Sequence, residues 1–168
     1  MKKKLYLLLR IIFTNIFIVF IFVTLIELFF GYWFDKDNFG PYMREHRMKK
    51  EKIIWESEDE IIQYDYKKNY YGFRGDDIDP SKIKAIMLGG SAIDEKFKPH
   101  QYTITGFLNS NLKENNSPIK IINAGVWGQS TIGMVSGFEN WLFKIKKFRP
   151  KYILIYTGFS DLARVTGD

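Results

Sequence analysis

Residues 83–91 read IKAIMLGGS, a short apolar run that ends in two glycines and a serine, and this stretch decides the fold. Such a run is typical of a strand buried in the interior of a sheet. Two later stretches repeat the pattern, IKIINAG at 119–125 and YILIYTG at 152–158, and both end in glycine. The sequence therefore predicts three buried strands whose carboxyl ends carry small and polar residues.

Helix-length segments at 102–114 and 131–148 separate the three strands. In the second segment apolar residues recur at helical spacing, lysines gather near its C-terminal end, and Pro150 follows. Alternating strands and helices indicate right-handed crossovers and a parallel sheet with helices on both faces. We expect residues 83–168 to form an α/β domain with a three-layer, flavodoxin-like parallel sheet. Ligands of such sheets bind beyond the carboxyl ends of the strands.

The N-terminus carries a basic segment, residues 1–10, and then an almost entirely apolar segment, residues 11–30. A helix of about 20 residues spans roughly the 30 Å hydrocarbon core of a bilayer. Tyr32 and Trp33 follow where interfacial aromatic residues lie. The alternative is a cleavable signal peptide, whose apolar region would be shorter and would end in small residues. We expect an uncleaved single-pass transmembrane helix, with a cytoplasmic N-terminus and a C-terminal domain exported to the periplasmic or extracellular face.

Between the apolar segment and the first strand, residues 31–82 are rich in charged and aromatic residues and show no sustained period. We expect a membrane-proximal connector that packs on the domain, with short local structure at 53–62.

Composition narrows the function classes. The net charge is +6, but the lysines are scattered among acidic residues instead of forming one basic face, so we expect no nucleic-acid partner. The chain has no cysteine and only two histidines, His46 and His100, which argues against a metal site. The glycine motifs of dinucleotide and P-loop sites are absent. We therefore expect neither a metal nor another cofactor.

The residues after the three strands suggest acyl-transfer chemistry. A serine between a buried strand and a helix, Ser91, presents its hydroxyl at the sheet edge, and N–H donors nearby would hold the oxyanion. Gly125 is a candidate donor because substrate can approach a residue without Cβ, and Ser160 is a further one. The same edge would be lined by Gly90, Asn123, Gly158 and Asp161. An ordinary turn or a phosphate-binding loop is the alternative for Gly-Gly-Ser taken alone.

Four motifs in this order resemble the SGNH, or GDSL, serine hydrolases, in particular bacterial members with one N-terminal membrane helix. YGFRG at 71–75 is similar to a lead-in before the first strand, and LGGS at 88–91 to the nucleophile block. NAGVWGQST at 123–131 and YTGFSDL at 156–162 resemble the second and third blocks. The resemblance implies a partial SGNH hydrolase fold, with Ser91 as nucleophile and oxyanion donors at positions 125 and 160.

The chain departs from the family pattern in three places. Gly90 stands where many members have Asp, and Ser160 stands where the third block has Asn. The family also places an Asp-x-x-His block after further strands and helices, whereas this sequence ends at Asp168 without it. His100 follows Ser91 too closely to serve as its base, and His46 precedes the domain.

These observations leave two main hypotheses. The first is an envelope ester hydrolase or acyltransferase acting on O-acylated glycans or lipids, incomplete as given and inactive alone, which would pair with a missing C-terminal half. The second is a non-catalytic anchored binding or assembly module that retains the pocket. A nucleotide-binding α/β protein ranks last because the phosphate motifs are absent.

Overall fold

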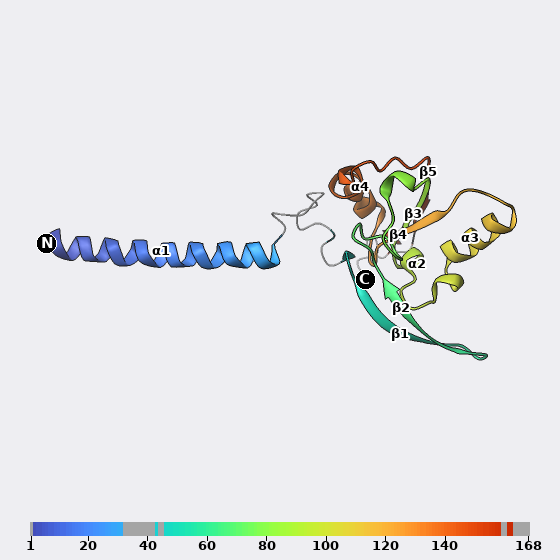
Figure 1. The fold of residues 1–168 in the computed structure, drawn as a ribbon, viewed down its shortest axis with the longest axis horizontal. Helices are drawn as coiled ribbons and strands as arrows, with labels where there is room; N and C mark the ends of the chain where they lie inside the picture. The colour runs from blue at the N-terminus through green and yellow to red at the C-terminus, as the bar shows by residue number, and fades with distance from the viewer. Residues whose placement is uncertain (1, 32–42, 44–45, 159–160, 163–168) are drawn as a thin grey trace. The chain divides into compact units, whose positions relative to one another are not determined.

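The computed structural model describes residues 2–31, 43, 46–158 and 161–162, and divides the chain into two compact units, Met1–Pro41 and Tyr42–Asp168. The first unit holds helix α1, Lys2–Phe30 (Figure 1). Among the described residues, α1 is the one helix long and apolar enough to cross a membrane. Its polar side chains Asn15 and Thr24 donate to carbonyls four residues earlier, at 3.0 and 2.8 Å, so they are satisfied without water.

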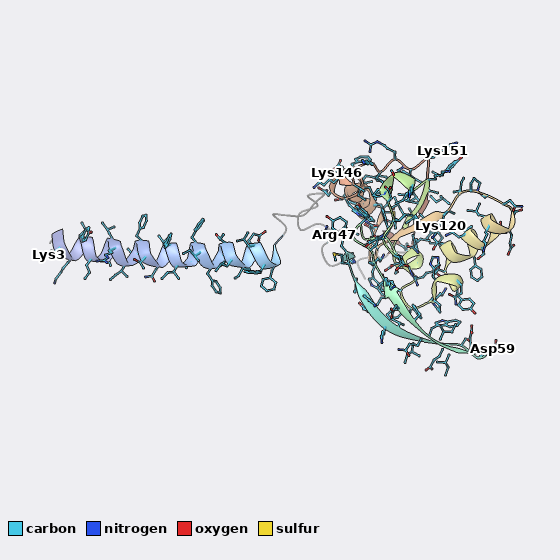
Figure 2. All side chains as sticks on the ribbon, viewed as in Figure 1. Lys3, Arg47, Asp59, Lys120, Lys146 and Lys151 are labelled. Carbon is cyan, nitrogen blue, oxygen red and sulfur yellow. The ribbon has the colours of Figure 1, made fainter. Side chains whose placement is uncertain are left out.

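An antiparallel hairpin opens the second unit. Strands β1, Lys50–Glu56, and β2, Ile61–Lys67, pair in full register from Lys50 opposite Lys67 to Glu56 opposite Ile61. Exposed and covered side chains alternate along both strands, as in a sheet with one packed face. Asp59 lies at the tip of the hairpin (Figure 2). The hairpin is longer than the short local structure expected at 53–62.

The second sheet is parallel, as predicted, and has the order β4-β3-β5. Its strands are β3, Ala85–Gly89, β4, Ile121–Gly125, and β5, Tyr152–Tyr156. All five residues of β3 are buried, in agreement with its central place. Gly89 lies beside both Gly125 and Tyr156 in the registers, so the three strands end in one row. The loops that follow them therefore start from the same edge of the sheet.

Helices follow the strands where the sequence predicts them. The elements are η2, Pro80–Lys82, α2, Ser91–Asp94, η3, His100–Tyr102, α3, Ile104–Glu114, α4, Thr131–Asn140, and η4, Leu142–Lys144. Thr103 and Ser130 cap α3 and α4, because each side-chain oxygen accepts from a backbone N–H three residues later. Helix α4 is shorter than the expected 131–148. It ends at Asn140 and is followed by the buried Trp141, whose indole N–H donates to the Tyr71 carbonyl at 2.6 Å.

Apolar residues cover both faces of this sheet. On one face, Ala85, Met87 and Ile121 form a cluster with Ile93 of α2, against which Ile104 of α3 packs. The alternate residues of β3, Ile86 and Leu88, are buried on the opposite face. On that side Ile153 of β5 borders the same cavity as Phe138 of α4 and Leu142 of η4. Helices thus flank the sheet on two sides.

Strand β5 is the least covered strand of this sheet. Tyr152, Ile153, Ile155 and Tyr156 each keep between 43% and 55% of their surface exposed. In the part of the chain that the structure describes, β5 pairs with β3 alone. An unpaired strand edge offers N–H and carbonyl groups to another strand.

Candidate functional site

Ser91 lies directly after the central strand and is the first residue of α2. It opens onto a cavity of about 480 Å³ at the carboxyl edge of the parallel sheet. No described residue forms a hydrogen bond with the Ser91 hydroxyl. The cavity is lined by Gly90, Ser91, Ala92, Glu95, Lys96, Phe97, Lys98, Ile104, Trp127, Gln129, Met134, Tyr156, Thr157, Gly158 and Asp161. The hydroxyl is therefore available to a ligand in a pocket formed by all three strand-end loops.

Gly125 lies beneath α2 and has a packing role. A Cβ on this residue would lie 2.3 Å from the Asp94 nitrogen and 2.7 Å from the Ile93 carbonyl carbon. The N–H of Gly125 donates to the Asn123 side-chain oxygen at 3.0 Å. Its carbonyl accepts from Lys68 at 2.6 Å. The oxyanion role of Gly125 stays a prediction, and it would require this N–H to leave Asn123.

Two residues of the loop after β4, Gly128 and Gln129, are candidate site residues that the sequence did not reveal. Gly128 is exposed, has φ +72° and would meet no atom within 4 Å of an added Cβ. None of the described residues accepts a hydrogen bond from its N–H. Its neighbours Trp127 and Gln129 both line the cavity, and within the described residues the buried Gln129 Oε1 has no hydrogen-bond donor. The sequence signal that could have identified Gly128 is that it is the second glycine of the 123–131 motif.

The other predicted site residues that the structure describes lie either in the Ser91 cavity or below α2. Gly90, Gly158 and Asp161 line the cavity with Ser91. The Asp161 carboxylate accepts from both the N–H and the hydroxyl of Thr131 at 2.8 Å, which ties the loop after β5 to the start of α4. Asn123 is buried below α2 instead. Ser160 lies outside the described residues.

The groups that could act as acids or bases at the cavity are already engaged. Glu95 accepts from Lys98 Nζ at 2.9 Å and from the Ile104 N–H at 2.6 Å. His100 lines a different cavity, of about 640 Å³, which it shares with Arg74 and Lys120. Burial and these two cations lower the pKa of His100. Among the described residues no histidine lines the Ser91 cavity, and no cluster of three His, Asp or Glu side chains could hold a metal.

Aromatic side chains form the rim of the cavity. The rings of Phe97 and Trp127 meet edge to face, with centroids 5.7 Å apart, and each side chain is more than half exposed. Met134 and Ile104 extend the apolar lining inward. The pocket therefore combines the Ser91 hydroxyl, a few other polar groups and an apolar wall, which is the usual make-up of a small-molecule site.

Comparison with known proteins gave neither a matching family model nor a matching curated protein. Among solved structures the chain is similar to the SGNH-hydrolase family esterase AlinE4, with 23% identity and a TM-score of 0.42 over 49% of this chain. Two single-residue mutants of that esterase match at 23% identity, with TM-scores of 0.41 and 0.40 over 48% of this chain. The chain spans 43–44% of the length of these proteins.

Proposed function

We propose that this chain carries the nucleophile of an SGNH-type ester hydrolase or acyltransferase, with Ser91 as the nucleophile. One observation carries the proposal: the Ser91 hydroxyl follows the central strand of a parallel sheet and opens, without a described hydrogen-bond partner, into a cavity at the carboxyl edge. Functional groups of open α/β sheets gather at this edge.

The proposed reaction begins with the Ser91 oxygen attacking an ester carbonyl while a base removes the hydroxyl proton. The ester C–O bond then breaks, the alcohol leaves with a proton, and the acyl group stays on Ser91 until water or an acceptor alcohol takes it. The N–H of Gly128 is the more available oxyanion donor in this proposal, because no described residue accepts from it, whereas the N–H of Gly125 donates to Asn123.

The base would come from outside the described residues. The family's Asp-x-x-His block suggests a histidine supplied by a further C-terminal segment or by a partner chain. We propose that such a segment also pairs with the exposed edge of β5. Its strands would supply the cover that β5 lacks among the described residues.

We propose O-acylated envelope glycans or lipids as substrates, with α1 as a single-pass anchor and the second unit exported. The apolar rim of Phe97 and Trp127 would receive the acyl group, and the polar lining would contact the alcohol part. Resistance of the full chain to alkaline extraction from membranes tests the anchor. Protease digestion of intact cells tests the export.

A non-catalytic anchored module is the second candidate. It is favoured by the lack of a histidine among the described lining residues of the Ser91 cavity. Such a module would bind the same acylated ligand through the cavity without cleaving it.

The test is covalent labelling of the full chain, in detergent micelles, with a p-nitrophenyl alkylphosphonate and with imidazole added to stand in for the base that the described lining residues lack. Release of one p-nitrophenolate per chain and attachment of the phosphonate at Ser91, found by peptide mass spectrometry, support the nucleophile. Ser91→Ala should abolish labelling, and Ser110→Ala, at an exposed serine of α3, should leave it unchanged. Equal labelling of the Ser91→Ala variant and the wild type would reject the proposal.

A further inference from the structure

We infer that Lys68 is a positioning residue, which fixes the turn that carries Ser91 against the end of β4. The inference on placement stands on the contacts of Lys68, and its consequence for reactivity rests on the function proposed for Ser91. Lys68 follows β2 and belongs to the segment that the sequence describes only as a connector.

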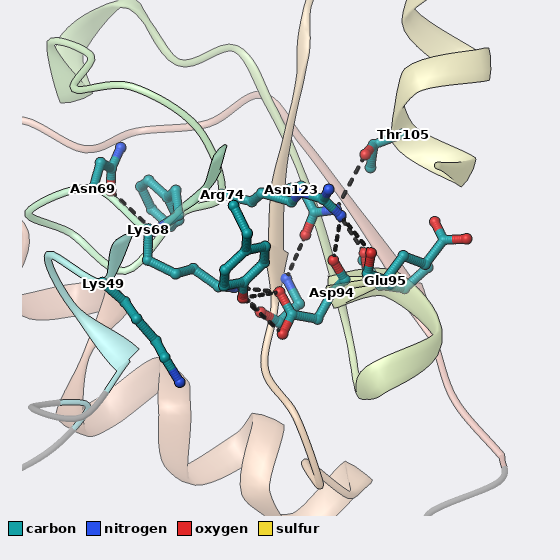
Figure 3. A network of polar contacts seen from close by, with 12 residues as sticks. Lys49, Lys68, Asn69, Arg74, Asp94, Glu95, Thr105 and Asn123 are labelled. Carbon is teal, nitrogen blue, oxygen red and sulfur yellow. Dashed lines mark hydrogen bonds and ion pairs between the residues drawn. The ribbon is translucent and has the colours of Figure 1, made fainter. Parts of the chain in front are cut away.

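The ammonium group of Lys68 joins two elements that are distant in sequence. It lies 2.7 Å from Asp94 Oδ1, on α2, and 2.6 Å from the Gly125 carbonyl, at the end of β4 (Figure 3). The side chains of Lys68 and Asp94 are only 1% and 4% exposed. Water therefore cannot replace either contact without opening the structure.

Asp94 completes a compact hydrogen-bonded group. Tyr66 donates its hydroxyl to both Asp94 oxygens, at 2.8 and 3.0 Å. Burial lowers the pKa of Lys68, whereas Asp94 opposes that shift. Burial and the same carboxylate raise the pKa of the Tyr66 hydroxyl. The cluster is therefore held together by a carboxylate that accepts from two donors of the 66–68 segment.

Arg74 holds the other end of the turn. Its guanidinium donates to the carbonyls of Asp94 at 2.6 Å, Glu95 at 2.8 Å and Lys98 at 2.5 Å. The Asp94 carbonyl belongs to the last residue of α2, and the Glu95 and Lys98 carbonyls follow it in the turn. The last carbonyls of a helix have no partner within the helix, so Arg74 supplies a donor there. Asn123 adds a bond from its amide to the Ile93 carbonyl at 2.5 Å (Figure 3).

The turn needs such support because α2 has only four residues. A helix of this length is not stable by itself. Arg74 donates to the Asp94 carbonyl, and Asn123 joins the Ile93 carbonyl to the Gly125 N–H. Among the described residues, Lys68 alone joins a side chain of α2, that of Asp94, to the Gly125 carbonyl. Gly125 leads into the loop with Trp127 and Gly128. Lys68 thus sets the nucleophile relative to the loop that would bind the oxyanion.

Lys67 provides a matched control. It is the preceding residue on β2, its side chain is 39% exposed, and its ammonium group lies 3.1 Å from Asp76 on the surface. Lys67→Met therefore removes the same charge from the neighbouring position without touching α2. Lys68→Met keeps the length of the buried side chain and removes both of its bonds.

The experiment compares the full-length wild type with Lys68→Met, Lys67→Met and the double variant Lys68→Met, Asp94→Asn in detergent micelles. The double variant leaves no unpaired buried charge, so it retains the fold if the single variant does not. Phosphonate labelling at Ser91 gives a maximal rate constant and a half-saturating concentration. Amide hydrogen exchange is followed at Ile93, Asp94, Glu95 and Val126, whose N–H groups bond to the carbonyls of Gly90, Ser91 and Gly89.

In the Lys68 variants we expect the maximal labelling rate to fall at least tenfold and the half-saturating concentration to change less than threefold. Exchange at the four amides should rise at least tenfold, while the β3 amides and the Lys67→Met protein stay like the wild type. Unchanged exchange, or exchange that rises equally throughout the domain, would overturn the inference. If the wild type is not labelled but exchange rises only at these amides, the proposed function of Ser91 fails and the role of Lys68 in placement stands.

Discussion

Replacing Gly125 by alanine should displace the Ser91 turn. The added Cβ would lie 2.3, 2.7 and 2.9 Å from the Asp94 nitrogen, the Ile93 carbonyl carbon and the Asp94 Cα, all of them backbone atoms. Ordinary contact begins at 3.4 Å, so α2 must move away from β4 by roughly 1 Å. Overpacking of this kind costs about 1–3 kcal/mol. Weakening the Asn123 and Lys68 bonds adds about 1 kcal/mol.

We therefore expect Gly125→Ala to lose about 3 kcal/mol of unfolding free energy, or about 10 °C in the midpoint of thermal unfolding. Circular dichroism of the full chain in micelles measures this midpoint. Gly133→Ala is the control, because its Cβ would meet side chains and no backbone, Gln129 Cγ at 3.0 Å and Ser130 Oγ at 3.8 Å, and alanine favours the helix. A Gly125→Ala midpoint within 2 °C of the wild type would refute the packing argument.

Three further predictions test other parts of the fold. Trp141→Ala should lower the free energy of unfolding in urea by about 3–5 kcal/mol, because the indole is 1% exposed and packs on Phe73. Phe143→Ala, at an exposed side chain, should lower it by less than about 1 kcal/mol. Equal losses in the two variants would contradict this prediction. The pKa of His100 is lower in the folded state than in the unfolded chain, so the fold favours the neutral imidazole. This contribution to stability is full above pH 6.5 and is lost as the pH falls through the pKa that His100 has in the folded state. His100→Gln should therefore reduce the fall in thermal midpoint between pH 7 and pH 5. An unchanged slope would show that His100 does not cause this pH dependence. Asp161→Ala should lower the free energy of unfolding by about 1 kcal/mol in the same urea assay, because the first N–H of α4 loses its acceptor. Asp161→Asn should lose less, because its amide oxygen can still accept part of that bond. An equal loss of stability in both variants would show that the charge of Asp161, and not its hydrogen bond, stabilises α4.

The parallel sheet was predictable because each strand is a short apolar run with a glycine after it. Strand β5 has the bounds expected from the sequence, and β3 and β4 begin two residues later than their apolar runs. The early end of α4 was not predictable. Residues 141–148 continue the helical spacing, but the burial of Trp141 against Tyr71, 70 residues earlier, overrides that local preference.

The candidate site was predictable only where it depends on strand ends. Gly90, Ser91, Gly158 and Asp161 share a cavity because their strands end in one row. Lys68 was not recognised, because a lysine in a charged segment looks the same as a surface residue. Arg74 was noticed only as part of the YGFRG motif at 71–75, with no role assigned to it. Their role depends on contacts with residues 20 to 57 positions further along the chain, and no local pattern encodes such contacts.

The separation in sequence between Lys68, Asp94 and Gly125 bears on the order of folding. Each bond of this cluster closes a long loop, whose entropy must be lost before the contact forms. The four-residue helix α2 depends on these contacts and on the sheet beneath it, so we expect the Ser91 turn to settle after the parallel sheet and its contacts to be weak or absent in the transition state. Substitutions at Lys68 should then accelerate unfolding and leave the folding rate nearly unchanged. The Ser91 turn would be the last part of this domain to form and the first to open.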